Sequence, residues 1–123
     1  MPTLAAVLVP RMAARRSVTH TCHHRFVLRH IVLFAFKDDA PADERTAILE
    51  ALEGLRTTVP SLRSLEIGEN ISPARAQGYT HILCETFDDR AGLAAYGAHP
   101  AHVPVAARIR AATVQLLAVD LES

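Results

Sequence analysis

GYTHILCETFDDRAGLAAYGAHPAH, residues 78–102, contains one predicted strand and the helical region that follows it. Residues 79–87 are rich in aliphatic and aromatic side chains, as strands are. Two aspartates at 88–89 then offer an N-cap for a helix that ends near Gly97, because glycine favours helix C-termini. Pro100 suits the first turn of a second helix. The stretch therefore predicts a strand followed by two short helices.

Regular elements are also predicted on both sides of this stretch. Residues 29–36 (RHIVLFAF) form a strand whose two faces are both apolar, so both must be covered. Residues 41–58 carry an apolar stripe at helical spacing. Residues 62–71 and 113–121 indicate two more strands, the first with a bulge or bend at Gly68. The order of elements is therefore β-α-β-β-α-β.

This order of elements is typical of a ferredoxin-like α+β fold. The helices can cover only one face of a four-stranded sheet, which leaves an apolar face exposed. A second copy of the chain is the simplest cover, because two-fold dimers are the commonest homo-oligomers. We therefore expect a homodimer that pairs through the sheet face.

Residues 1–28 differ in composition from the rest of the chain. They are rich in arginine, alanine, threonine and histidine, hold no acidic residue and show no clear periodicity. We interpret them as a disordered N-terminal extension; a targeting leader and a mis-assigned start codon are the alternatives. Their segment HTCHH (20–24) has metal-binding residue types, but no second ligand cluster accompanies it, so we interpret it as unstructured.

The net charge of zero is unevenly distributed along the chain. Residues 1–37 hold six basic groups and no acidic ones, whereas residues 38–123 hold seven basic and thirteen acidic groups. An acidic domain lacks the surface that nucleic acids require, so we expect no nucleic acid partner. No apolar run approaches the ~20 residues that cross a bilayer, so we expect no membrane partner. Cys22 and Cys84 suggest no disulfide framework, which favours the cytoplasm.

Several motifs in this order carry a resemblance to a known family. They are RHIVLF at 29–34, GYTH at 78–81, Phe87, Tyr96 and HPAH at 99–102. Together they resemble the stress-responsive A/B barrel (Dabb) family over residues 29–121, so residues 29–123 are interpreted as one such domain. The resemblance implies a dimeric α+β barrel in which two protomers pair sheet to sheet.

The resemblance also implies a site. A polyketide cyclase of this family drives an intramolecular aldol condensation without metal or cofactor, and its catalytic residues match His102 as general base and Tyr96 as the group that holds the reacting carbonyl. The residue types suit that chemistry, because histidine accepts protons near neutral pH and a phenol stabilises an enolate oxygen. We therefore expect no cofactor and a small-molecule ligand.

The same match places further residues in a mostly apolar pocket between sheet and helices. The residues expected to bind substrate are His30, Phe34, Leu52, His81, Leu83 and Glu85. Two departures from the cyclase stand out: Ile48, Leu49 and Leu52 replace bulky aromatics, and Glu85 replaces an aliphatic residue. A carboxylate here suits a more polar ligand, or raises the pKa of a neighbouring histidine.

Each candidate also has a structural interpretation. His30 and His81 can be core histidines bonded to backbone carbonyls, His99 a turn residue before proline, and Tyr96 a buried ring. Glu85 needs a buried partner, for which histidine or arginine is the natural choice. His30, His81, Glu85 and His102 are also residue types that bind metals, but the matched cyclase uses no metal, so none is expected.

Three functions remain open from the sequence. The first is a small dimeric enzyme without cofactor that uses His102 and Tyr96 for aldol or enolisation chemistry on a carbonyl metabolite. The second is a non-catalytic stress-responsive dimer with a structural or ligand-binding role. The third is a cofactor-free monooxygenase of the dimeric barrel superfamily, which rests on fold analogy alone. A pocket that holds His30, Glu85, Tyr96 and His102 favours an enzyme.

Overall fold

The computed structural model describes residues 26–123, so most of the predicted extension at 1–28 and the whole HTCHH segment lie outside the described residues. The elements are β1 (Leu28–Phe36), α2 (Ala42–Thr58), β2 (Ser64–Glu69), the short 3₁₀ helix η1 (Pro73–Arg75), β3 (His81–Phe87), α3 (Arg90–Ala98), α4 (His102–Ala112) and β4 (Thr113–Glu122). Strand β1 begins one residue before the predicted start. Within residues 26–123, no helix has the length and apolarity needed to span a membrane.

The four strands form one antiparallel sheet in the order β2-β3-β1-β4. Strand β1 is therefore central and lies between β3 and β4. His30 on β1 lies opposite Glu85 on β3 and opposite Asp120 on β4. Gly68 pairs with Ile82 in an unbroken register, so the predicted bulge in β2 is wrong. The bulge in this sheet lies instead at Ala35 and Phe36, where the register with β4 shifts.

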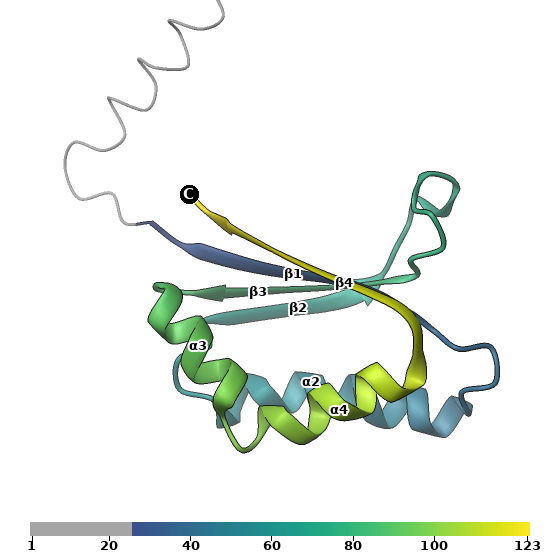
Figure 1. The fold of residues 1–123 in the computed structure, drawn as a ribbon, viewed down its shortest axis with the longest axis horizontal. Coiled ribbons are helices and arrows are strands. Elements are labelled where there is room, and N and C mark those ends of the chain that lie inside the picture. The colour runs from purple at the N-terminus through teal and green to yellow at the C-terminus, as the bar shows by residue number, and fades with distance from the viewer. Residues whose placement is uncertain (1–25) are drawn as a thin grey trace, which may run out of the picture.

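All three α-helices pack against the same face of the sheet (Figure 1). The apolar stripe predicted for α2 is the buried one, because Ile48, Leu52 and Leu55 are all inaccessible to solvent. Helix α3 begins as predicted, at an N-cap where Asp89 Oδ1 accepts a hydrogen bond from the Gly92 amide at 2.8 Å. The core between helices and sheet contains, among others, Val32, Phe34, Ile48, Leu52, Leu55, Leu65, Leu83, Phe87, Tyr96, Val105 and Ile109.

The opposite face of the sheet has no helix over it (Figure 1). Leu117, Val119 and Leu121 on β4 are about half exposed there, and Leu33 and Ile82 continue the apolar surface across β1 and β3. We call this surface the open face. The connection between β2 and β3, which contains η1, rises on this side of the sheet. These features confirm the ferredoxin-like α+β fold and the uncovered apolar face.

Candidate functional site

A buried pair of acidic groups lies between α3 and β3. Tyr96 and Glu85 are 2% and 1% exposed, and the Tyr96 hydroxyl donates a hydrogen bond to Glu85 Oε2. The other carboxyl oxygen, Oε1, is the one buried side-chain polar atom in the described chain without a hydrogen-bond partner. The expectation that histidine or arginine would be the partner of Glu85 is therefore wrong. The phenol takes that place because α3 carries Tyr96 directly over β3.

Burial controls the acidity of both groups. Desolvation raises the pKa of Glu85, opposed by the hydrogen bond from Tyr96 and by the charge of His30. Desolvation also raises the pKa of the Tyr96 phenol well above its usual range, and Glu85 raises it further. The phenol is consequently a hydrogen-bond donor and not an anion at neutral pH.

His102 begins α4 and packs against the same tyrosine. The centroids of the two rings lie 4.2 Å apart, with the rings tilted by 46°. His102 Nδ1 lies 3.3 Å from the Gly97 carbonyl, and because a carbonyl only accepts, Nδ1 carries the proton. In the neutral ring the lone pair then lies on Nε2. Burial lowers the pKa of His102, which keeps the ring neutral and able to accept a proton.

His30 completes the group from the central strand. Its Nδ1 lies 2.5 Å from Asp120 Oδ1, so a carboxylate orients the imidazole. His30 is the register neighbour of Glu85, and its charge acts on both Glu85 and His102. The sequence interpretation missed Asp120 as a site residue and treated it only as part of the last strand. The missing signal was the strand order, which brings β4 beside β1.

His81 lies elsewhere. It is stacked on Phe34 with ring centroids 5.2 Å apart, and its edge meets Phe36 at 5.3 Å. Its Nδ1 lies 2.8 Å from Thr80 Oγ1. It borders a cavity of about 380 Å³ between α2 and β2. No contact joins it to Tyr96 or His102 among the described interactions, so the structure does not bring His81 into this group.

The other candidates are core or turn residues. Phe34, Leu52 and Leu83 are buried in the apolar core beneath the helices. His99 caps the C-terminus of α3, and its Nδ1 accepts a hydrogen bond from the Ala101 amide at 3.0 Å. This is the turn role that its position before proline predicted. Within residues 26–123, no three histidine, cysteine or acidic side chains are grouped so as to hold a metal ion.

A comparison with family models decides the relationship. The model described as the stress responsive A/B barrel domain, Dabb, matches residues 28–123. The chain belongs to the Dabb family.

Individual relatives agree with that assignment. A stress-response A/B barrel domain-containing protein of Arabidopsis thaliana is 33% identical over 75% of this chain and 82% of its own length. Olivetolic acid cyclase of Cannabis sativa is 26% identical over 62% of this chain and 76% of its own length.

Solved structures show the same fold. A dimeric ferredoxin-like protein of unknown function from Thermobifida fusca superposes with a TM-score of 0.70 at 25% identity, over 85% of this chain and 98% of its own. A hydroxynitrile lyase from Passiflora edulis superposes with a TM-score of 0.74 at 22% identity, over 79% of this chain and 93% of its own, which shows the shared fold alone.

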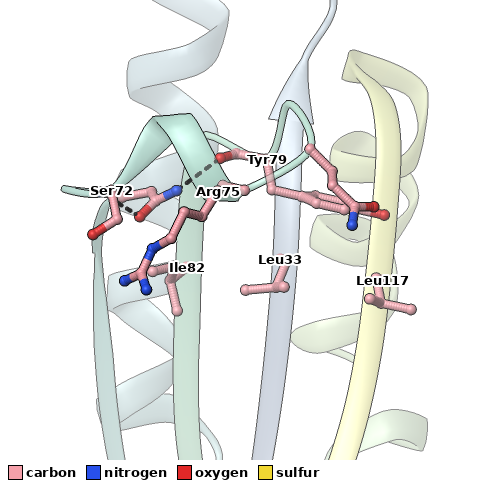
Figure 2. A pocket seen from close by; sticks show the side chains of 9 residues that line it. Leu33, Ser72, Arg75, Tyr79, Ile82 and Leu117 are labelled. Carbon is pink, nitrogen blue, oxygen red and sulfur yellow. Dashed lines mark hydrogen bonds between the residues drawn. The ribbon is translucent and has the colours of Figure 1, made fainter.

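Two further cavities of this Dabb domain lie near Asp120 and on the open face. The first, of about 320 Å³, is lined by Leu28, Arg90, Leu93, Asp120 and Glu122, and so touches the partner of His30. The cavity in Figure 2, of about 550 Å³, lies between the open face and the β2–β3 connection. None of these three cavities is lined by Tyr96, Glu85 or His102.

Proposed function

We propose that this Dabb domain is a dimeric, cofactor-free acid/base enzyme that acts on a carbonyl-containing metabolite. His102 is the general base, and Tyr96 binds the reacting carbonyl. The observation that carries the proposal is the packing of a neutral imidazole, whose Nε2 holds the lone pair, on the ring of a buried phenol. Such a pair offers a base and a hydrogen-bond donor side by side in apolar surroundings.

The proposed reaction is an enolisation followed by an aldol addition. His102 Nε2 removes a proton from the carbon next to a carbonyl, and the electron pair moves onto the carbonyl oxygen, which Tyr96 stabilises. The enolate carbon then attacks a second carbonyl of the same chain, forming a carbon–carbon bond and an alkoxide. The imidazolium returns its proton to that alkoxide, so protons and electrons balance. The name of one relative, olivetolic acid cyclase, supports this class of reaction.

Two of the predicted substrate-binding residues fit this site. Glu85 is hydrogen-bonded to Tyr96, and His30 lies opposite Glu85 in the sheet, so we assign both to the polar side of the site. We assign Phe34, Leu52 and Leu83 to its apolar wall, because they belong to the core cluster that contains Tyr96. His81 is assigned instead to the cavity between α2 and β2.

The proposed enzyme is a homodimer whose protomers meet at the open face. Exposed apolar side chains on β4 support this, since an uncovered patch of this kind marks an interaction surface. The dimeric ferredoxin-like neighbour of the same fold supports it as well. We also propose a cytoplasmic location, for which the free thiol of Cys84 is the supporting observation.

One observation favours the alternative of a non-catalytic structural or ligand-binding dimer. Tyr96 and Glu85 are nearly inaccessible, and the cavities described above are lined by neither. A ligand must therefore displace packed side chains or enter beside Asp120. If it does neither, the polar group is part of the core architecture.

A ligand screen separates the two functions. Linear ketones and short 3-oxoacyl thioesters are added to the wild type and to the Tyr96→Phe/His102→Ala double variant, and melting temperatures are compared. The enzyme proposal expects compounds that stabilise the wild type alone and that incorporate deuterium next to the carbonyl in D₂O. If every compound leaves both proteins unchanged, and the double substitution only lowers the melting temperature, the structural alternative is correct.

A further inference from the structure

Glu85 Oε1 is a buried oxygen that the proposed mechanism leaves unexplained. Its carboxyl group is 1% exposed, and its one hydrogen bond, to Tyr96, uses the other oxygen. An ionised carboxylate can accept about four hydrogen bonds, and leaving a buried charge so poorly solvated is costly. A protonated carboxyl group in the same place leaves only one neutral carbonyl oxygen without a partner.

None of the groups that face Glu85 gives its Oε1 atom a hydrogen bond. Tyr96 approaches from α3 with a single hydroxyl, and Leu65 on β2 is apolar. His30 on β1 is the neighbouring imidazole, but its Nδ1 already pairs with Asp120 on β4. A positive charge on His30 opposes the rise in the pKa of Glu85, but His30 shares that charge with Asp120 and gives Glu85 Oε1 no hydrogen bond. His102 on α4, which packs on Tyr96, is held neutral by its own burial.

We propose that Glu85 is a positioning residue that remains protonated in the working protein, where it donates its own proton to the Tyr96 oxygen and frees the Tyr96 hydroxyl hydrogen for the carbonyl oxygen of the ligand. The two oxygens stay in the same hydrogen bond, and only the direction of donation changes. The ligands expected at Tyr96 are therefore compounds with an oxygen atom that accepts a hydrogen bond from its hydroxyl. Amines are not expected, because an ammonium group binds a carboxylate and not a neutral carboxyl group. The role of Glu85 in catalysis rests on the proposed function, whereas its protonation state does not.

Infrared difference spectroscopy tests the protonation state without any substrate. Spectra of the wild type minus Glu85→Gln, each as the full chain at pH 7, should contain the carbonyl stretch of a protonated carboxylic acid. The matched control is Glu122→Gln, because Arg90 holds Glu122 in an exposed ion pair and lowers its pKa. Its difference spectrum should show carboxylate bands instead. Carboxylate bands in the Glu85 difference spectrum would overturn the inference.

A second measurement covers the case in which Glu85→Gln does not fold. The side-chain carboxyl carbons of the wild type, labelled with ¹³C-glutamate, are followed by NMR between pH 4 and pH 9. One signal should keep the chemical shift of the acid form through pH 7, whereas Glu44 and Glu122, whose arginine partners lower their pKa values, should show the carboxylate shift there. If all signals titrate together in the acid range, the inference is wrong.

The pH dependence of catalysis distinguishes positioning from mere packing. Deuterium exchange by the wild type should fall as rising pH ionises Glu85, because the carboxylate then takes back the Tyr96 proton. Glu85→Gln keeps an N–H donor for the Tyr96 oxygen, so it should retain activity within a few-fold and lose this alkaline fall. Glu85→Leu should lose about tenfold or more at every pH, as expected for one lost hydrogen bond. An alkaline fall that persists in Glu85→Gln contradicts the inference.

The two proposals can fail separately. If no compound exchanges deuterium but the infrared and NMR spectra show a neutral Glu85, the enzyme proposal fails and the protonation state stands. If exchange is found and depends on His102, but Glu85 is ionised at pH 7, the enzyme proposal stands and the positioning role is wrong.

Discussion

Glu85, which lies beneath α3, shows how much about a single residue can be predicted from the sequence. Alternation along a strand requires Glu85 to share a face with Leu83 and Phe87, and all three are buried. The same spacing separates His81 from Glu85 by four residues, or about 13 Å along the strand. At that distance His81 lies beside Phe34 and Phe36 and not beside Tyr96. The identity of Glu85's partner was not predictable, because it depends on where α3 crosses the sheet.

The stability of the protein should record the pKa of Glu85. The pKa of Glu85 in the folded protein is raised above the ordinary value of 4.5. The stabilisation that the protonated Glu85 provides is therefore fully present below pH 4.5 and is lost as pH rises through the pKa of the folded state. Glu85→Gln cannot ionise, so it does not lose stability in this way. The melting temperature of the variant, relative to that of the wild type, should therefore rise as pH rises from 4.5. Thermal unfolding between pH 4 and pH 8 measures the difference, with the exposed Glu50→Gln as control. A difference that stays constant over this range would contradict the raised pKa.

At the scale of elements, the break between α3 and α4 assembles the site. Helix α3 ends just after Tyr96, and α4 begins at His102, so the turn at His99 brings the two rings together. The aspartate cap, glycine and proline made this break predictable from sequence. The His30–Asp120 pair was not, because it depends on β4 lying beside β1, and the order of strands is set by the tertiary fold.

The N-cap of α3 should be measurable in stability. Asp89→Ala removes the acceptor for the Gly92 amide and should lower the free energy of unfolding by about 1 kcal/mol. Asp89→Asn keeps an oxygen in that position and should restore most of the loss. Chemical denaturation of the three proteins gives these differences. Equal losses in both variants would show that the charge, and not the cap, stabilises α3.

At the scale of the whole molecule, the two faces of the sheet differ in what covers them. Helices α2, α3 and α4 cover one face (Figure 1), and the other presents Leu33, Ile82 and the exposed apolar residues of β4. A standard interface buries about 1,600 Å² of total surface, and a sheet face of this kind can supply it from two copies. Hydrophobic periodicity sufficed to predict this division, because four strands and helices on one side leave no other arrangement.

A pair of matched valines tests where the dimer forms. Val119 on the open face and Val103 on α4 are 49% and 51% exposed. Val119→Asp should shift the protein towards monomer in size-exclusion chromatography with light scattering, because it places a charge in the proposed interface. Val103→Asp should leave the dimer intact, since a carboxylate in the first turn of a helix is well tolerated. If Val103→Asp dissociates the protein and Val119→Asp does not, the dimer uses the helical side.

The central claim is that His102 removes a proton from carbon, and its most direct test is the rate of that step. Deuterium uptake next to the carbonyl of a short 3-oxoacyl thioester is followed by NMR in D₂O, with the uncatalysed rate subtracted. His102→Ala should lower the catalysed rate by about 10²–10⁴-fold with the dimer still folded. The control His99→Asn retains an acceptor for the Ala101 amide and should stay within a few-fold of the wild type. Undiminished exchange by a folded His102→Ala protein would contradict the proposed role of His102.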